Sequence, residues 1–251
     1  MLNFSIITVV YNAVNTVGCA IESVLAQQYP NLEYIIIDGA STDGTVEKVQ
    51  EYASSVSRMV SEPDNGLYDA LNKGIDMASG DVIGFLHADD WYVHGEVIGN
   101  VARIMEEEES DALYADLQYV KQKDTSKVLR HWRAGEFSRN NFLSGWMPPH
   151  PTFFVRREIY REYGGFDLDF TSAADYELML RLLFRHEISC SYLPDVIVRM
   201  RSGGTSNKSI ANRLKANRED YRAWKKNDLN PRFYTRFMKP VSKIPQLFLQ
   251  S

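Results

Sequence analysis

The sequence predicts an α/β fold built on a mainly parallel β-sheet. Short runs of apolar and β-branched residues alternate along the chain with segments that have the periodicity of amphipathic helices. This alternation is typical of parallel strands connected by helices that cover both faces of a sheet. The length of 251 residues suffices for one large α/β domain with a small appendage.

The first half of the chain contains most of this alternation. Strands are expected at residues 4–10, 32–38, 58–61, 82–86 and 112–119, and helices at about 15–27, 45–55, 67–78 and a segment that ends near 109. The first helix is expected to bury one apolar face, formed by Val17, Ala20, Ile21, Val24 and Leu25. These segments together form a first half, residues 1–118.

The second half has a different character. It is expected to contain a polar hairpin at 119–132, a Pro-bearing loop at 145–150, an apolar run at 152–155, an amphipathic helix at 175–186 and an extended segment at 188–200. A polar loop at 202–207 precedes a basic helix that ends near 226. We therefore divide the chain into a domain of residues 1–207, with a second half at 119–207, and a basic helical C-terminal extension at 208–251.

The charge is unevenly distributed. The whole chain has a net charge of -5, yet the segment from Arg199 to Lys243 contains 13 Lys/Arg and 3 Asp/Glu. Such a segment suits an anionic partner, or it is a solvated helical surface. The tail at 233–249 combines aromatic and basic residues, which favours either contact with a membrane interface or packing against the domain or a homodimer partner.

The cellular location is predicted from what the sequence lacks. Two cysteines, Cys19 and Cys190, do not make a disulfide framework and fit a reducing compartment. We see no signal peptide and no apolar run near the roughly 20 residues that span a bilayer. The expected location is the cytoplasm, with the inner face of the cell membrane as a site of peripheral contact.

Polar residues follow three of the predicted strands. Ligands of open parallel sheets bind at the carboxyl ends of the strands, where Tyr11, Asp38 and the pair Asp89–Asp90 are expected to converge. The acidic pair suits Mg²⁺ or Mn²⁺, whose shell a ligand phosphate would complete; alternatively, the two acids cap a following helix. Asp38 can accept a hydrogen bond from a base or ribose, and Tyr11 can either stack on a base or pack in the core.

Several nucleotide-binding classes are excluded by the turn after the first strand. Residues 11–16 contain no glycine, which argues against a dinucleotide-binding dehydrogenase, and the chain has no phosphate-binding loop of the Gly-Lys-Ser/Thr type. Zinc-ligand spacings and a nucleophile elbow are also missing from the sequence.

Seven short motifs in order make the chain resemble the family-2 glycosyltransferases, which have the GT-A fold. The motifs are TVVYN (8–12), DGASTDGT (38–45), DNGLYDALNKG (64–74), FLHADD (85–90), PHPTFF (149–154), GGFD (164–167) and ADYELMLR (174–181). The resemblance covers residues 3–207 and implies a GT-A-like, Rossmann-type sheet flanked by helices. It also implies that residues 1–118 are the nucleotide-sugar-binding half and residues 119–207 the acceptor-binding and catalytic half.

The resemblance also implies roles for individual residues. Thr8, Tyr11 and Asp38 would hold the base and ribose, Asp89 would contact the ribose or metal, and Asp90 would ligate the divalent ion at the donor diphosphate. Asn12 and Asp64 lie in the same motifs and are further donor-binding candidates. Asp175 would be the general base, although the Glu-Asp pair common in the family is Ala174–Asp175 here.

Other residues are weaker candidates. His150 could contact the diphosphate or acceptor or be a structural histidine, and Trp146 in the same loop is a candidate for the same role. Arg199 and Arg201, beside Gly203–Gly204, could bind the diphosphate, or they belong to a surface loop. Lys73 is a phosphate candidate or a solvated helix lysine.

The predicted function is metal-dependent, inverting transfer of a hexose or N-acetylhexosamine. The donor would be a nucleotide sugar, UDP-linked by preference, and the acceptor a glycan or lipid-linked saccharide for capsule, exopolysaccharide or lipopolysaccharide; nucleic acid is not an expected partner. The alternatives are a nucleotidyltransferase, which usually has a Gly-rich basic loop after the first strand, and a non-catalytic binder of nucleotide sugar or nucleic acid. The acceptor would be chosen by the segment at 119–149.

Overall fold

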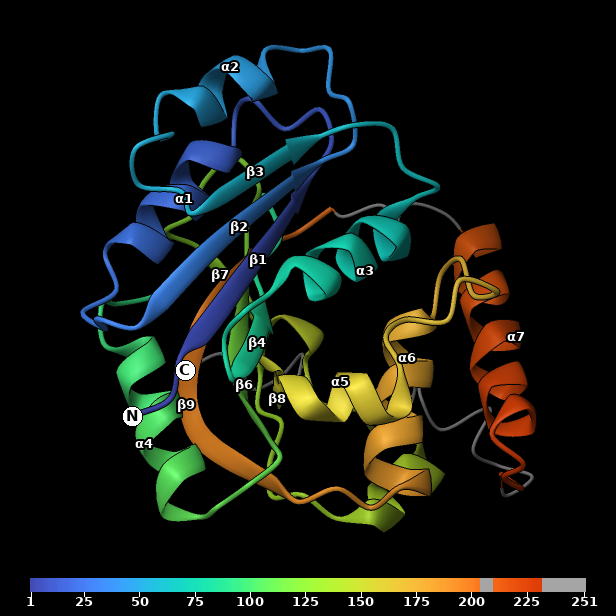
Figure 1. Ribbon diagram of the computed structural model, residues 1–251. Helices are drawn as coiled ribbons and strands as arrows, with labels where there is room; N and C mark the ends of the chain where they lie inside the picture. The colour runs from blue at the N-terminus through green and yellow to red at the C-terminus, as the bar shows by residue number, and fades with distance from the viewer. Residues whose placement is uncertain (204–209, 232–251) are drawn as a thin grey trace.

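The computed structural model describes residues 1–203 and 210–231 (Figure 1). Its strands are β1 (Phe4–Val10), β2 (Leu32–Asp38), β3 (Arg58–Ser61), β4 (Val82–Phe85), β5 (Asp90–Tyr92), β6 (Ala112–Val120), β7 (Val128–Trp132), β8 (Phe154–Arg156) and β9 (Cys190–Arg201). Its helices are α1 (Val17–Leu25), α2 (Thr45–Gln50), α3 (Leu67–Met77), α4 (Val97–Glu107), α5 (Arg157–Tyr163), α6 (Ala174–Met179) and α7 (Ile210–Lys226), and a π-helical segment, Leu180–Arg185, continues α6.

The strands form one mixed sheet in the order β3-β2-β1-β4-β8-β6-β9-β5, with β7 paired to β6. The first four strands are parallel, as predicted. Beyond them, β8 lies antiparallel between β4 and β6, and β5 lies antiparallel to β9. The prediction of parallel strands therefore holds for β1 to β4 and for the β6–β9 pair, whereas β5, β7 and β8 form antiparallel pairs.

Alternating residues of each strand supply two hydrophobic layers. In β1, Phe4 and Ile6 pack with α1 and α4 on one face, and Ile7 and Val9 pack with α3 on the other. Both layers are fully apolar because the sheet is covered on both faces, which explains the continuous apolar runs in the sequence. In α1 the predicted buried face is confirmed except for Leu25, the last residue of the helix, which is 37% exposed.

The basic extension begins as a helix that packs on the domain. The side chain of Trp224 in α7 is 1% exposed, and its indole N–H donates to the Tyr176 hydroxyl at 2.9 Å. The Asn227 amide donates to Glu177 Oε1 at 2.9 Å, and Lys226 pairs with Asp169 at 2.6 Å. The predicted basic helix is thus confirmed, with one face buried against α6. The tail at 233–249 and most of the 202–207 loop lie outside the described residues.

Two features were not predicted. Helix α5 follows β8 directly, and the three-residue strand β5 occupies the position where the sequence suggested the start of a helix. In the parts of the chain that the structure describes, no helix is long and apolar enough to cross a membrane.

Gly84 is required by the packing between β4 and β8. A Cβ atom at this position would lie 2.5 Å from the Phe154 ring, inside its van der Waals surface. We expect Gly84→Ala to lower the free energy of unfolding by about 1–3 kcal/mol, the usual effect of overpacking a core. Gly99→Ala in α4 is the matched control, because nothing lies within 4 Å of its Cβ position, and it should stabilise the helix by up to about 1 kcal/mol. Denaturant unfolding of both variants checks the prediction; equal stability of the two would contradict it.

Candidate active site

The turns after β1 and β2 are joined by hydrogen bonds from Asn12. Its backbone N–H donates to Ser41 Oγ at 2.8 Å, and its side-chain Oδ1 accepts from the Thr42 N–H at 2.9 Å. Asn12 has a positive φ of 48°, a conformation that asparagine tolerates better than most residues. Asn12 therefore fixes the relative position of the two turns.

Tyr11, Gly39 and Asp64 meet beside these turns. A Cβ atom on Gly39 would lie 2.4 Å from Asp64 Oδ2 and 3.4 Å from the Tyr11 ring, so only glycine permits this close approach. The Tyr11 side chain is 66% exposed and does not pack in the core. The structure thus excludes core packing for Tyr11 and places an accessible aromatic ring next to two carboxylates, Asp38 and Asp64, that border the end of the sheet.

Asp38 ends β2 and is fully buried. Its Oδ2 accepts hydrogen bonds from the Ser61 hydroxyl at 2.6 Å and from the Ser41 N–H at 3.0 Å. Its Oδ1 has no partner in the described part of the chain. Because a buried acceptor without a partner is unfavourable, this oxygen is available to a donor group of a ligand.

Two of the predicted donor-binding residues are engaged elsewhere. The Thr8 hydroxyl is buried against the Tyr34 hydroxyl, 3.0 Å away, on the face of the sheet that packs on α1. Lys73 Nζ donates to the Pro63 carbonyl and pairs with Glu62 at 2.8 Å. The polar groups of both side chains therefore have partners within the protein.

Asp89 and Asp90 follow β4 and enter β5. Asp90 pairs with Met200 of β9, and helix α4 begins only at Val97, which excludes the alternative that the two acids cap a helix. The Arg201 guanidinium donates to the Asp89 carbonyl at 2.7 Å and lies 4.5 Å above the Trp91 ring. Arg201 thus ties the end of β9 to the acidic pair.

The Asp90 carboxylate has an unusual environment. Its side chain is 0% exposed, and neither oxygen has a hydrogen-bond partner in the described structure. Burial raises the pKa of Asp90 well above its usual range, the neighbouring Asp89 raises it further, and Arg201 opposes both. Such a carboxylate fits a divalent cation, which would replace the missing partners.

Protein ligands alone would not complete the coordination shell of this cation. In the part of the chain that the structure describes, no group of three or more His, Cys, Asp or Glu side chains is arranged to hold a metal. Asp90 and Asp89 would supply the protein ligands, and the remaining positions would be filled by ligand phosphates and water, as is common for Mg²⁺.

Asp175 lies in the first turn of α6, across the site from the acidic pair. The Tyr68 hydroxyl at the start of α3 donates to Asp175 Oδ1 at 3.2 Å. Burial and then the charge of Asp175 raise the pKa of Tyr68, so Tyr68 stays protonated and keeps donating. Tyr68 therefore orients Asp175. The sequence suggested no residue for this role, because alanine occupies position 174, where the family often has an acid.

Two histidines lie between Asp175 and the acidic pair. The His150 ring stacks on Phe85 at 5.5 Å and lies 5.7 Å from the His87 ring. Burial lowers the pKa of His150 to about 4, and His87 lowers it further, whereas Asp175 opposes them. Burial also lowers the pKa of His87, against the charges of Asp89 and Asp175. Both rings are therefore neutral at pH 7, and His87 and Tyr68 are site residues that sequence reasoning missed, although both lie inside recognised motifs.

Two further candidates have mainly structural contacts. The Trp146 indole N–H donates to the Ala134 carbonyl at 2.8 Å, and its ring packs edge-on against Tyr114 and Phe142. Arg199 Nε donates to Gln118 Oε1 at 3.3 Å across the β6–β9 pair.

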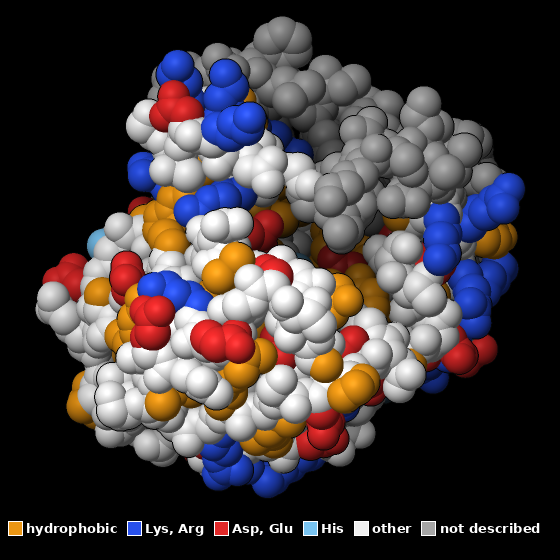
Figure 2. Space-filling model, turned by 90° about the horizontal axis from the view of Figure 1, so that it is seen from above, with side chains coloured by type: hydrophobic (Ala, Val, Ile, Leu, Met, Phe, Trp, Pro, Cys, Tyr) orange, Lys and Arg blue, Asp and Glu red, His pale blue; other side chains and the backbone are white. Residues whose placement is uncertain are grey.

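Figure 2 looks down on the end of the molecule where β1 and β2 finish, and it shows acidic side chains in a hollow of this face.

The mixed sheet with helices on both faces is a fold of the GT-A type. Two solved structures share the fold: S. aureus TarS 1-349 in complex with UDP (TM-score 0.72, 19% identity, 94% of this chain and 69% of that one) and the mannosyltransferase PcManGT from Pyrobaculum calidifontis in complex with GDP-Man and Mn²⁺ (TM-score 0.67, 20% identity, 99% and 70%).

Residues 5–164 match the model of glycosyl transferase family 2, and the chain belongs to this family of glycosyltransferases. It is 35% identical over 179 residues to an uncharacterized glycosyltransferase of Mycobacterium tuberculosis, covering 70% of this chain and 67% of the relative. It is also 28% identical over 216 residues to a PGL/p-HBAD biosynthesis glycosyltransferase of Mycobacterium bovis, covering 82% and 80%.

The burial of the Asp90 carboxyl group without partners should reduce stability at neutral pH in metal-free buffer. Its folded-state pKa lies above the unfolded value of about 3.9, so its contribution to stability falls as the pH rises from that value through the folded pKa. We expect Asp90→Asn to melt a few degrees higher than the parent at pH 7, where 1 kcal/mol corresponds to about 2–4 °C. The difference should shrink towards pH 4. A variant that melts lower than the parent at pH 7 would contradict an unpaired buried carboxylate.

Proposed function

We propose that the protein transfers a hexose or N-acetylhexosamine from a UDP-linked donor to a hydroxyl of a glycan or lipid-linked saccharide, with inversion at the anomeric carbon. The observation that carries the proposal is the arrangement of three carboxylates, Asp38, Asp90 and Asp175, around one edge of the sheet. There, Asp38 and Asp90 present buried oxygens without partners, and Asp175 faces them across two neutral histidines. A nucleoside diphosphate with a bound cation would satisfy both sets of oxygens.

The donor would be held by the turns after the first two strands. We expect the Tyr11 ring to stack on the base, and the Asp38 oxygen without a partner to accept a hydrogen bond from the base or ribose. Asp64 borders the same space through its contact with Gly39. UDP and UDP-GlcNAc are bound by TarS, and GDP-Man with Mn²⁺ by PcManGT, which supports a nucleotide-sugar donor for this chain.

The acidic pair and Arg201 would hold the diphosphate end of the donor. Asp90, with Asp89, would bind Mg²⁺ or Mn²⁺, which neutralises the negative charge that grows on the leaving diphosphate. Arg201 already lies at the Asp89 carbonyl, and its guanidinium can donate further hydrogen bonds to phosphate oxygens. Arg199, on the same strand, is a second cation for this role.

Asp175 would act as the general base. The acceptor oxygen attacks the anomeric carbon, the bond from that carbon to the diphosphate oxygen breaks, and the hydroxyl proton passes to Asp175. Tyr68 holds the carboxylate by its hydrogen bond to Oδ1, which leaves Oδ2 for the acceptor hydroxyl. The neutral His150, whose Nε2 has no partner in the described residues, would hydrogen-bond to the acceptor.

The acceptor and location follow from weaker observations. The PGL/p-HBAD biosynthesis relative favours an acceptor used in cell-surface glycan or glycolipid synthesis. A cytoplasmic location with peripheral contact to the inner membrane stays a prediction, because the tail at 233–249 on which it depends lies outside the described residues.

Nucleotide binding tests the donor site directly. We expect calorimetric titration of the pure protein to show binding of UDP in the presence of Mn²⁺, weaker binding without it, and weaker binding of GDP, CDP and ADP. In Asp90→Ala the effect of Mn²⁺ should disappear, because the cation loses its buried ligand. Selective GDP binding would change the donor and keep the mechanism, whereas the absence of any nucleotide binding with metal present would contradict the proposed function.

Substitution at Asp175 tests the base. Asp175→Asn should lower turnover by about 10²–10⁴-fold with unchanged UDP binding, because the proton acceptor is lost while the donor site is intact. Tyr68→Phe should have a smaller effect than Asp175→Asn. Loss of one hydrogen bond of about 1 kcal/mol should reduce kcat about fivefold and leave KM for the donor unchanged. Initial rates measure the loss of turnover in both variants, and calorimetry measures their UDP binding. Full transfer activity in Asp175→Asn would overturn the assignment of Asp175 as the general base.

A further inference from the structure

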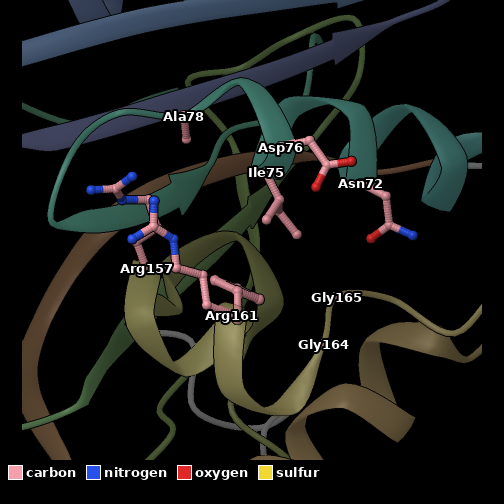
Figure 3. A pocket seen from close by; sticks show the side chains of 9 residues that line it. Asn72, Ile75, Asp76, Ala78, Arg157, Arg161, Gly164 and Gly165 are labelled. Atoms are coloured by element: carbon pink, nitrogen blue, oxygen red, sulfur yellow. The ribbon is translucent and has the colours of Figure 1, made fainter.

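A pocket of about 410 Å³ lies between the C-terminal part of α3 and helix α5 (Figure 3). Its walls include Asn72 and Asp76 from α3, Arg157, Tyr160 and Arg161 from α5, and the Gly164–Gly165 turn. A volume of this size matches the lower range of small-molecule sites. None of the roles assigned above uses this pocket.

The pocket is separate from the candidate active site. Tyr68, which contacts Asp175, and Asp76, which lines the pocket, are eight residues apart on one helix, a distance of about 12 Å. The pocket borders Ala78, just before β4, whereas Asp89 and Asp90 follow the opposite end of that strand. A ligand here would therefore lie at the amino ends of the parallel strands.

Two arginines that form no salt bridge within the described residues line the pocket, although the Asp81 carboxylate interacts with the charge of Arg157. Arg157 and Arg161 lie one helical turn apart, and Figure 3 shows both side chains extending from α5 towards α3. Neither forms a salt bridge with any residue in the described part of the chain, unlike Arg181 nearby, which pairs with Glu177 at 3.0 Å. Two like charges at this spacing repel each other, and an anion between them would remove the repulsion.

Two buried donors at the pocket also have no partner. Nε of Arg157 and the hydroxyl of Tyr160 are buried and make no hydrogen bond within the described structure, and the Tyr160 side chain is only 4% exposed. Buried polar atoms are normally paired, so these two donors indicate a missing acceptor. Arginine guanidinium groups with an added hydroxyl are suited to the oxygens of a phosphate group.

The pocket also contains one carboxylate. Asp76 on α3 also lines the pocket, and Figure 3 shows its side chain on the other side of Ile75 from the arginines. A carboxylate disfavours a bare anion, but it accepts hydrogen bonds from the hydroxyl groups of a ligand. The combination favours a phosphate monoester that carries hydroxyl groups over inorganic phosphate.

We propose that this pocket is a second ligand site, which binds a hydroxyl-bearing phosphate ester through Arg157, Arg161 and the Tyr160 hydroxyl, with Asp76 accepting from the ligand hydroxyls. The site is independent of the nucleotide-sugar site. The same chemistry is offered by a soluble polyol phosphate and by the headgroup of a phosphate lipid.

The test is calorimetric titration of the full-length protein with glycerol 3-phosphate and with inorganic phosphate, in metal-free buffer at low ionic strength. Glycerol 3-phosphate should bind more tightly than inorganic phosphate. Arg161→Gln should weaken binding of both about tenfold, the effect of losing one charge-assisted hydrogen bond. Arg103→Gln in α4 is the matched control, an exposed arginine of the same charge on the other face of the sheet, and it should bind like the parent.

Two further variants separate recognition from general loss of structure. Asp76→Asn should reduce the preference for glycerol 3-phosphate over inorganic phosphate. The substitution removes a negative charge that repels inorganic phosphate, and it removes one of the two oxygens that accept hydrogen bonds from the ligand hydroxyls. Tyr160→Phe should weaken binding of both probes without lowering the melting temperature, since the hydroxyl has no partner to lose. Saturating UDP with Mn²⁺ should leave the binding unchanged.

Binding to vesicles of phosphatidic acid distinguishes a lipid headgroup from a soluble polyol phosphate as the ligand. Phosphatidylcholine vesicles serve as the negative control. Binding of soluble glycerol 3-phosphate that Arg161→Gln weakens supports the site with a soluble ligand, and binding only to phosphatidic acid with the same sensitivity supports it with a lipid headgroup. Absence of binding both to glycerol 3-phosphate and to phosphatidic acid vesicles, equal binding by Arg161→Gln and Arg103→Gln, or displacement by UDP would overturn the proposal. The first two outcomes would leave the proposed donor site untouched, and displacement by UDP would mean that the phosphate ester binds at the donor site instead.

Discussion

The parallel pairing of β1 with both β2 and β4 is the constraint on which the site depends. Val10 is in register with Asp38, and Ile7 with Phe85, so the turns after all three strands open at one edge of the sheet. The backbone hydrogen bonds of these strands are buried between two apolar layers, and a slip by one residue would turn every apolar side chain to the wrong face. The register that packs the core therefore also places the polar residues of the site.

The second half of the chain completes the site by long-range pairing. Asp90 is fixed by β9, more than a hundred residues further along the chain, and Arg201 at the end of β9 holds the Asp89 carbonyl. Burying Asp90 without partners costs free energy that the β5–β9 pairing and the surrounding core offset. A carboxyl group kept in this state would lose any bound proton on binding the divalent cation proposed above.

The sequence predicts local structure and strand ends well because both depend on nearby residues. The strands from β1 to β4, helix α3 and the basic helix α7 follow from the periodicity of apolar residues, and Asp38 and Asp90 follow from their positions after apolar runs. The short strand β5 and the antiparallel insertion of β8 exist only through partners far along the chain, which a local pattern does not reveal. For the same reason, the sequence could not show that the Thr8 hydroxyl is taken up by Tyr34, or that Tyr68 reaches Asp175.

One loop joins the candidate base to the second pocket. Asn72, in the pocket wall, accepts from the Phe166 N–H and donates to the Phe166 carbonyl, both at 2.8 Å. The Phe166 ring stacks on Tyr68, whose hydroxyl holds Asp175. A Cβ atom on Gly165 would lie 2.4 Å from Asn72 Oδ1, so a larger residue here would displace the Asn72 side chain from its hydrogen bond with Phe166. Helix α3 therefore contacts the proposed base through Tyr68 near its start and lines the second pocket through Asn72 and Asp76, and the turn at Gly165 packs between these two regions.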